Sequence, residues 1–340
     1  MSSKSYSHIF FIGRYQPLHN GHVSVIKKAQ ELSDKVHIFI GSANASRSIR
    51  NPFTYQERAS IFRQQFGKEI DQIRPISDYP YNDTKWITEV LTNIANIVGN
   101  TPNDKIAIIG HNKDNTTYYL SLFPQFQYIE VEQESSLNAT QIRDLYFGVE
   151  DILTDYFCKI PKATQDFLLQ FLESKEYLNL LEEYIYIQKY KDSWKDVPFP
   201  PTFVTVDSVV VQSGHILLVE RGGNPGKGLL ALPGGFLDLN EKMMDAAVRE
   251  LREETCLKVP APVLYGSCQG SQVFDHPLRS ARGRTITQAF YFKLKDMPEG
   301  LPKVKGSDDA RHAAWYPLSE IKPTQMFEDH FAIIQHFTHI

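Results

Sequence analysis

Residues 235–257 read Gly-Phe-Leu-Asp-Leu-Asn-Glu, then seven residues, then Arg-Glu-Leu-Arg-Glu-Glu-Thr-Cys-Leu. Apolar residues recur at helical spacing through the second part, so the segment predicts a helix with one apolar face to bury. Glu250, Glu253 and Glu254 stand at i, i+3 and i+4, which places three carboxylates on one neighbouring face. Carboxylates so placed repel one another unless a cation lies among them. Clustered hard oxygen ligands suit Mg²⁺, which in turn neutralises a diphosphate.

This segment resembles the Nudix box, which reads glycine, five residues, glutamate, seven residues and Arg-Glu-apolar-x-Glu-Glu. A solvated acidic helix face is the simpler interpretation, but the Leu-Pro-Gly-Gly turn at 232–235 and the fixed spacing argue against it. The resemblance implies that Glu253 and Glu254 bind Mg²⁺, with Mn²⁺ as an alternative ion. Glu250 is then a third ligand or a water-activating base, and Arg249 orients Glu253 one helical turn on.

One position departs from the family pattern, because Cys256 stands where the pattern has glycine. That glycine normally ends the helix with positive φ, so Cys256 must either be strained there or move the helix end. Glu241 is expected in the turn that enters the helix, where it supports the structure.

Length and composition limit the class of protein. The chain has 340 residues, 42% of them hydrophobic and 22% charged, which indicates a globular chain long enough for two domains. The net charge of −4 provides no basic field for nucleic acid or an anionic membrane. Three cysteines without metal-ligand spacing, no signal region and no stretch of membrane-spanning length predict a cytoplasmic protein with reduced thiols.

Short apolar runs alternate with helical periodicity up to about residue 150, which predicts a doubly wound parallel sheet. Two adjacent prolines end the stretch 194–201 and bar helix continuation. We therefore expect an α/β protein with an N-terminal doubly wound parallel-sheet domain at 1–190, a linker at 191–201 and a C-terminal α+β domain at 202–340. Strands are predicted at 8–12, 36–40, 106–109, 126–131, 202–211, 215–220, 287–294 and 313–316, and helices at 21–32, 54–66, 84–98 and within 162–190.

The first predicted strand runs into Gly-Arg-Tyr-Gln-Pro-Leu-His-Asn-Gly-His at 13–22, where an amphipathic helix begins. Gly13 allows the backbone to approach a ligand, and the helix start favours anions. His19 and His22 can donate hydrogen bonds to a phosphate that gains charge during reaction. The spacing makes two incidental surface histidines the weaker interpretation.

This turn resembles the nucleotidylyltransferase superfamily. Gly-Ser-Ala at 41–43, Ser-Ile-Arg-Asn-Pro-Phe-Thr at 48–54 and Asn-Ala-Thr-Gln-Ile-Arg at 138–143 narrow the resemblance to archaeal-type nicotinamide mononucleotide adenylyltransferases. Asn138 stands where that family's motif usually has serine.

The resemblance implies that Arg14 and Arg50 neutralise phosphates and that the helix start at Thr140, together with Arg143, holds the phosphates of ATP. It also implies that Trp86 stacks on the nicotinamide ring, although a Trp at helical spacing with Val90 also suits a core position.

A further polar loop, Gly-His-Asn-Lys-Asp at 110–114, follows a predicted strand end, where α/β folds place ligands. Gly110, His111 and Asp114 are therefore candidate substrate contacts, with an ordinary polar loop as the alternative.

The segment Phe-Asp-His-Pro-Leu-Arg-Ser-Ala-Arg-Gly-Arg-Thr-Ile-Thr at 274–287 resembles that of ADP-ribose pyrophosphatases associated with NAD metabolism. Arg279, Arg282 and Arg284 could pair with diphosphate oxygens, for which the guanidinium fork is well shaped. A basic surface loop or an RNA contact is the alternative that composition alone allows.

The two resemblances together imply a bifunctional enzyme. One half makes NAD and pyrophosphate from ATP and nicotinamide mononucleotide, and the other hydrolyses ADP-ribose to AMP and ribose 5-phosphate. Nicotinic acid mononucleotide, and NAD(H) or another dinucleotide, are the alternative substrates. A further alternative makes the second half an ADP-ribose sensor, but that predicts eroded box carboxylates, and all three are present.

The water-activating base is not fixed by the motif, and Asp308 and Asp309 are candidates. A C-terminal helical apolar stripe predicts a packing face or the interface of a homo-oligomer, and it consists of Phe327, Phe331, Ile334 and Phe337.

Overall fold

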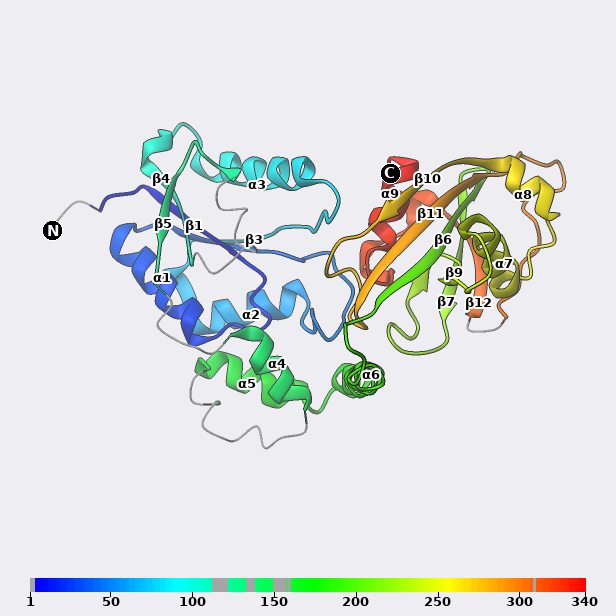
Figure 1. Ribbon diagram of the computed structural model, residues 1–340. Helices are drawn as coiled ribbons and strands as arrows, with labels where there is room; N and C mark the ends of the chain where they lie inside the picture. The colour runs from blue at the N-terminus through cyan, green and yellow to red at the C-terminus, as the bar shows by residue number, and fades with distance from the viewer. Residues whose placement is uncertain (1–3, 112–121, 133–137, 149–156, 158–159, 308–309) are drawn as a thin grey trace. The chain divides into compact units, whose positions relative to one another are not determined.

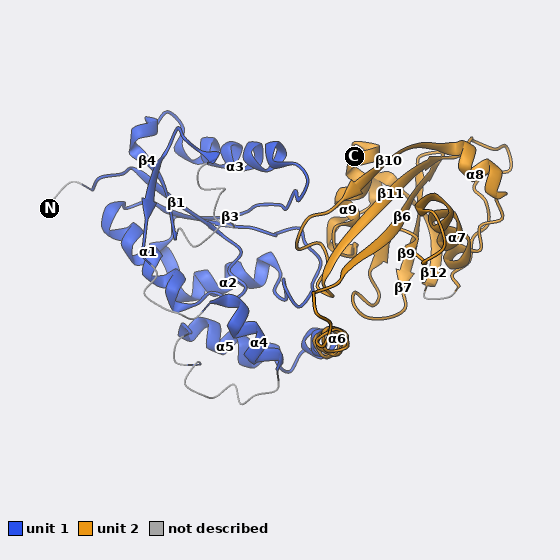
Figure 2. Cartoon of the chain, in the orientation of Figure 1, with its two compact units in different colours: residues 1–181 blue, residues 182–340 orange. Residues whose placement is uncertain are grey.

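A computed structural model describes residues 4–111, 122–132, 138–148, 157, 160–307 and 310–340 (Figure 1). The chain divides into two compact units, Met1–Leu181 and Glu182–Ile340 (Figure 2). The division falls inside helix α6 (Lys175–Asp192), whereas the sequence placed the domain boundary at 190 and a linker at 191–201. Glu183 shows why the end of α6 goes with unit 2, because its Oε2 accepts a hydrogen bond from Gly226 N at 2.9 Å.

Unit 1 is built on a five-stranded sheet in the order β3-β2-β1-β4-β5. Every neighbouring pair is parallel, which confirms the predicted doubly wound sheet. The strands are β1 (His8–Gly13), β2 (Val36–Ile40), β3 (Gln72–Pro75), β4 (Ile106–Gly110) and β5 (Gln127–Glu130). Sequence patterning missed β3, because this edge strand is largely polar and exposed.

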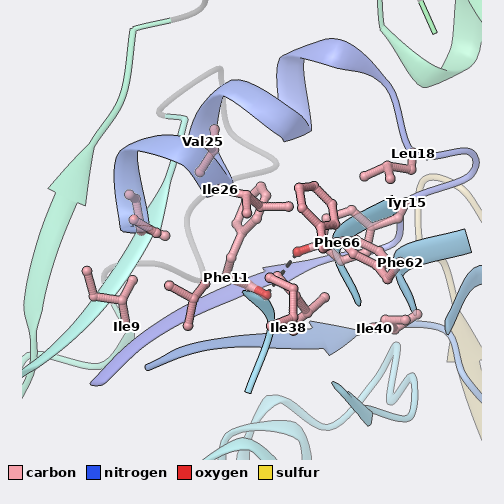
Figure 3. Close-up of a cluster of buried hydrophobic side chains, with 14 of the residues drawn as sticks. Ile9, Phe11, Tyr15, Leu18, Val25, Ile26, Ile38, Ile40, Phe62 and Phe66 are labelled. Atoms are coloured by element: carbon pink, nitrogen blue, oxygen red, sulfur yellow. Dashed lines mark hydrogen bonds between the residues drawn. The ribbon is translucent and has the colours of Figure 1, made fainter. Parts of the chain in front are cut away.

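Both faces of this sheet are covered, as a parallel sheet requires. Along β1 the side chains alternate: Ile9 and Phe11 join the core under α1 and α2, whereas Phe10 and Ile12 join the core under α3. Figure 3 shows the first of these cores, and Figure 1 shows α3 on the face opposite α1 and α2. The helices of this unit are α1 (Asn20–Leu32), α2 (Tyr55–Phe66), α3 (Asp83–Val98), α4 (Ala139–Phe147), α5 (Lys162–Phe171) and the first part of α6.

The start of α2 is fixed by local chemistry. Thr54 caps the helix through its side chain, which accepts from Glu57 N at 3.3 Å, and Glu57 Oε2 accepts from Thr54 N at 2.7 Å. This capping box satisfies two otherwise unpaired backbone donors. The sequence predicted it.

Unit 2 contains a mixed sheet in the order β10-β11-β6-β7-β12, with β8 beside β7 and β9 beside β6. Strands β6 and β11 pair in parallel over ten residue pairs, and the other pairings are antiparallel. The strands are β6 (Thr202–Gln212), β7 (His215–Arg221), β8 (Leu230–Ala231), β9 (Gly234–Phe236), β10 (Cys268–Phe274), β11 (Arg284–Lys293) and β12 (Ala310–Pro317).

Helix α7 (Met243–Thr255) carries the quoted box and packs its apolar face on this sheet. Ala247 and Leu251 of α7 lie in one core with Val206 and Val210 of β6. The short helix α8 (Ala261–Ser267), which the sequence did not predict, closes the same core with Leu264. The predicted α+β class of this half is confirmed.

Helix α9 (His330–Thr338) accounts for most of the C-terminal apolar stripe. Ile334 is fully buried, and the Phe337 ring lies 5.6 Å from the Tyr291 ring of β11. The stripe therefore packs within unit 2. Among the helices that the structure describes, none combines the length and apolar character needed to cross a membrane.

Two candidate active sites

The first site is built at the carboxyl ends of β1 and β4. His19 is the N-cap of α1, and its backbone N–H donates to His22 Nδ1 at 3.3 Å. The two imidazole rings lie 3.7 Å apart between centroids. Because Nδ1 of His22 accepts this bond, the proton of the neutral ring is on Nε2, which can donate to an anion. Gly21 leaves room for the His19 ring, since a Cβ at Gly21 would lie 3.0 Å from His19 Cε1.

His111 follows β4 and is buried against this turn. Its Nδ1 lies 2.7 Å from Val131 O and donates to it, and its Nε2 lies 3.4 Å from Gly21 O. His111 thus supports the histidine turn from the neighbouring strand end, which Gly110 closes. The third predicted residue of this loop, Asp114, lies outside the described residues.

Three guanidinium groups crowd the same region. Arg143 of α4 is buried and donates to Gln16 O at 2.7 Å, to Ala139 O at 3.1 Å and to Thr140 Oγ1 at 3.2 Å. Burial, and then the charge of Arg14, lower the pKa of Arg143 to about 10. The pKa of Arg50 is also lowered to about 10, by burial first and then by Arg14, with Arg143 adding to the effect.

The charge of Arg14 lowers the pKa of both Arg50 and Arg143, which means that these cations repel each other in the ligand-free protein. A polyanion bound among them would relieve this repulsion. The cluster of Arg14, Arg50 and Arg143 therefore suits a polyphosphate.

Arg58 holds the strand ends of this site together, a role that sequence reasoning missed. The side chain is fully buried and donates to the carbonyls of Arg14 (2.6 Å), Gly41 (2.7 Å), Ser42 (3.0 Å) and Thr54 (3.2 Å). Burial lowers its pKa to about 10. The Glu-Arg pair after the segment 48–54 was visible in the sequence, but its backbone partners are distant in the chain.

Two of the predicted ligand contacts, Gly13 and Trp86, pack against aromatic side chains of the protein. The ring of Tyr15 covers Gly13, where a Cβ would lie 2.8 Å from Tyr15 Cζ, and Tyr15 Oη donates to Phe11 O at 2.9 Å (Figure 3). Packing of Tyr15 therefore explains the glycine without a ligand. Trp86 is partly buried, and its ring lies 5.8 Å from that of Phe123 at the edge of the α3 core.

The second site lies where the turn at 232–235 meets α7. Arg249 is its hub: Nη2 donates to Glu241 Oε1 at 2.6 Å, and Nη1 donates to Glu250 at 2.8 Å and to Glu253 at 3.0 Å. Glu241 precedes the helix, as expected, and its Oε1 also accepts from Asp238 N at 2.9 Å. A single guanidinium thus offsets the repulsion among neighbouring carboxylates.

Glu254 and the two glycines before the helix fit one another closely. Gly234 N donates to Glu254 Oε2 at 2.9 Å, and a Cβ at Gly235 would lie 2.4 Å from Glu250 Oε1. Burial, partly offset by the hydrogen bond from Gly234, raises the pKa of Glu254 to about 8, and the charge of Glu250 adds to the increase. Glu250 therefore requires a glycine at 235, whereas Gly234 is required by β6, because a Cβ there would lie 2.1 Å from Val206 O.

Neighbouring carboxylate oxygens, here of the buried Glu254, the half-buried Glu250 and the exposed Glu253, are the donors that Mg²⁺ and Mn²⁺ prefer, so the residues fit such an ion by their chemistry. Within the described part of the chain, no three His, Cys, Asp or Glu side chains already converge as a metal cage. Arg249 explains this, because it holds Glu250 and Glu253 in its own hydrogen bonds.

Comparison with known proteins matches the two units of the chain to two different families. The cytidylyltransferase-like family model matches residues 10–145, and the NUDIX domain model matches residues 201–337. A crystal structure of a bifunctional NMN adenylyltransferase/ADP-ribose pyrophosphatase from Francisella tularensis, complexed with AMP and a Mn ion, is 36% identical, with a TM-score of 0.89. The similarity covers 98% of this chain and 99% of that one. The chain belongs to this bifunctional family.

Separate relatives match each half. Nicotinamide/nicotinic acid mononucleotide adenylyltransferase of Acinetobacter baylyi is 35% identical over 184 residues, which are 53% of this chain and 94% of that protein. ADP-ribose pyrophosphatase of Methanocaldococcus jannaschii is 37% identical over 134 residues, which are 39% of this chain and 72% of that protein. The family's two domains thus correspond to units 1 and 2.

Within this family member, the three arginines of 274–287 differ in their surroundings. Arg279 is buried and donates to both oxygens of Asp329, at 3.0 Å each. Arg282 lies over the Phe236 ring at 5.4 Å, and Arg284 Nη1 donates to Asp275 O at 2.5 Å. The fork of Arg279 is thus committed to a carboxylate of the protein, contrary to the role expected for it from the sequence, and this leaves Arg282 and Arg284 as the candidates for diphosphate.

Sequence reasoning also missed a buried polar network under this site. Asp207 Oδ2 accepts from Thr287 Oγ1 at 2.6 Å and lies 3.8 Å from Arg279. His330 Nδ1 accepts from Leu232 N at 2.9 Å, and burial lowers the pKa of His330 to about 3, so its ring is neutral. The C-terminal Asp-His pair at 329–330 was the available signal. Asp308 and Asp309, the expected candidates for the base, lie outside the described residues.

Cys256 resolves the question raised by the box pattern. Helix α7 ends at Thr255, and Cys256 takes the left-handed conformation (φ 51°, ψ 26°) that the family's glycine supplies. Its backbone N–H donates to Arg252 O at 2.9 Å, as a helix cap requires. The helix therefore ends where the family's glycine would end it, and Cys256 adopts the strained left-handed conformation.

We expect Cys256→Gly to stabilise unit 2 by about 0.5–1 kcal/mol, because relief of left-handed strain outweighs the entropy that glycine adds to the unfolded chain. The thermal unfolding transition of unit 2, followed by calorimetry, should move up, and Cys268→Ser serves as the control for loss of a thiol. An unchanged or lower transition in Cys256→Gly would refute the strain argument.

Proposed function

We propose that the two units catalyse two reactions of NAD metabolism in one chain. Unit 1 transfers the adenylyl group of ATP to nicotinamide mononucleotide, giving NAD and pyrophosphate. Unit 2 hydrolyses ADP-ribose to AMP and ribose 5-phosphate. The observation that carries the proposal is the pairing of a histidine–arginine phosphate site in unit 1 with the Arg249-centred carboxylate helix in unit 2.

In unit 1, the mononucleotide phosphate attacks the α-phosphorus of ATP in line, and pyrophosphate leaves without a covalent enzyme intermediate. Positioning and charge neutralisation supply the rate. His22 Nε2 donates to the reacting phosphate, with His19 beside it at the N-terminus of α1, where the helix dipole favours anions. Arg14, Arg50 and Arg143 neutralise the polyphosphate, and Thr140 holds Arg143 in place.

In unit 2, Glu250, Glu253 and Glu254 would hold Mg²⁺, or Mn²⁺ in its place, and the ion supplies charge neutralisation of the diphosphate. Arg249 releases Glu250 and Glu253 as the ion enters and stays tied to Glu241. The backbone N–H of Gly234 orients Glu254. Arg282 and Arg284 pair with diphosphate oxygens, while Arg279 holds their loop through Asp329.

Nicotinic acid mononucleotide is the second candidate substrate of unit 1, because the Acinetobacter relative is named for both mononucleotides. Side-by-side rates with the amide and the acid, each with ATP and Mg²⁺, distinguish the two. Purified full-length protein should form NAD with one or both, and should release AMP from ADP-ribose within a panel of nucleoside diphosphate derivatives. If the protein does not cleave ADP-ribose, the function proposed for unit 2 is wrong. If it forms no dinucleotide from either mononucleotide, the function proposed for unit 1 is wrong.

A further inference from the structure

The segment 326–330 is hydrogen-bonded to residues 230–232, which lead into the turn of the hydrolase site. Phe327 N donates to Leu230 O at 2.8 Å, and Leu232 N donates to His330 Nδ1 at 2.9 Å. Two residues beyond Leu232, Gly234 N binds Glu254. The segment therefore lies beside the turn that orients the box carboxylates.

The opposite flank of this segment meets the arginine loop. Asp329 accepts from Arg279 of that loop through two hydrogen bonds, and on the other side of Glu328 the Phe327 ring lies 4.1 Å from the guanidinium of Arg221, at the end of β7. The residue between these two anchors, Glu328, is thus held between the box turn and the candidate diphosphate loop.

Glu328 has two costly features. Its backbone is left-handed, with φ 43°, a conformation that side chains other than Gly, Asn and Asp rarely adopt. Its Oε1 is fully enclosed and has no hydrogen-bond partner. Within the described part of unit 2, it is the one carboxylate oxygen in this condition. Strain and an unsatisfied buried acceptor at one residue indicate a group held for function.

The charges around Glu328 favour a proton acceptor at neutral pH. Burial raises its pKa to about 7, against the lowering effects of Arg282, Arg279 and a hydrogen bond with Ser280, and Asp329 raises it further. These are the charged and polar groups that face it from its own segment and from the loop 274–287. A base works best when its pKa lies near the working pH.

We propose that Glu328 is the catalytic base that takes a proton from the attacking water in unit 2. The box carboxylates have another role in the proposed reaction, because Glu250, Glu253 and Glu254 would hold the metal ion, and Glu254 also accepts from Gly234 N. The inference rests on the proposed hydrolysis of ADP-ribose.

In this step the water oxygen forms a bond to one phosphorus of the diphosphate as its proton moves to Glu328. The bond between that phosphorus and the bridging oxygen breaks, and its electron pair stays on the departing phosphate. AMP and ribose 5-phosphate result, and Glu328 then returns its proton to solvent.

The test compares Glu328→Gln, Glu328→Asp and Glu328→Gly with the wild type in full-length protein with Mg²⁺, and Glu320→Gln, an exposed glutamate, is the matched control. Glu328→Gln should lower kcat for ADP-ribose by roughly 10²–10⁴-fold, with KM changed by less than about threefold. Glu328→Asp should keep more activity than Glu328→Gln. NAD formation by unit 1 should stay at the wild-type rate in every variant.

The pH profile separates a base from a supporting residue. The active form of Glu328 is ionised, so wild-type kcat should rise with pH through about 7, and this limb should vanish in Glu328→Gln. Glu328→Gly should unfold at a higher temperature than the wild type while it loses kcat, because glycine relieves the left-handed strain.

A raised KM with kcat and the pH limb retained would overturn the inference, since it would mean that Glu328 only positions Arg282. Near wild-type kcat in Glu328→Gln or Glu328→Gly would also overturn it. Wild-type protein that leaves ADP-ribose intact would instead refute the proposed function of unit 2.

Discussion

His22→Ala should lower kcat for NAD formation by roughly 10²–10³-fold, since it removes a hydrogen-bond donor aimed at the phosphate that gains charge. The backbone N–H of His19 donates to Nδ1 of His22, so in the neutral ring the proton that can be donated is on Nε2. Arg143 is held by Gln16 O and Thr140 Oγ1, so we do not expect it to move into the place of this donor. Rates of NAD formation at saturating ATP and mononucleotide measure the effect.

Hydrolysis of ADP-ribose should stay within about twofold of the wild type in His22→Ala, because the two sites belong to separate units. His312→Ala, which removes an exposed histidine of unit 2, is the control and should leave NAD formation unchanged. Parallel loss of both activities in His22→Ala would contradict the assignment of one reaction to each unit.

Glu254→Gln should lower ADP-ribose hydrolysis by roughly 10²–10³-fold, because it removes one charge from the group that would hold the metal ion. Glutamine keeps an oxygen that can accept from Gly234 N, so the turn at 232–235 should remain in place. The Mg²⁺ concentration needed for half-maximal rate should rise as well. That shift distinguishes loss of a metal-binding charge from damage to the substrate pocket.

Glu299→Gln replaces an exposed glutamate of the same unit and should behave as the wild type. NAD formation by Glu254→Gln provides a second control, since it reports that the rest of the chain is intact. Full hydrolysis by Glu254→Gln at ordinary Mg²⁺ would contradict the role given to this carboxylate.

Elements with a strong local pattern were predictable from the sequence. Strand β2 was predicted with the observed bounds, since four of its five residues are apolar and all five are buried. Helix α2 was predicted within one residue, because the Thr54–Glu57 box marks its start. Strands β3 and β10 escaped prediction, because both are largely exposed and polar. Each becomes a strand by hydrogen bonding to its neighbour, β2 for β3 and β11 for β10, and that neighbour is not visible in the local pattern.

Site residues whose partners lie far along the chain could not be found in this way. Arg58 looks like an ordinary helix arginine until Gly41 and Arg14 bring their carbonyls to it, 17 and 44 residues away. Glu328 was part of a segment read only for its apolar stripe. Its strain and its unpaired oxygen exist only because Leu230 and Arg279 fix the residues on either side.

The sequence by itself determined the two reaction classes, because each motif is a local pattern on one turn and one helix. Spacing alone places Glu250, Glu253 and Glu254 on one face of α7, and His19 and His22 at the start of α1. Tertiary structure decided how these groups are used. Asp329, 50 residues beyond Arg279, takes the guanidinium fork that the sequence assigned to substrate. Burial and pairing with distant residues decide which side chains are charged and which can still bind substrate, and the spacing of residues along the chain does not reveal either.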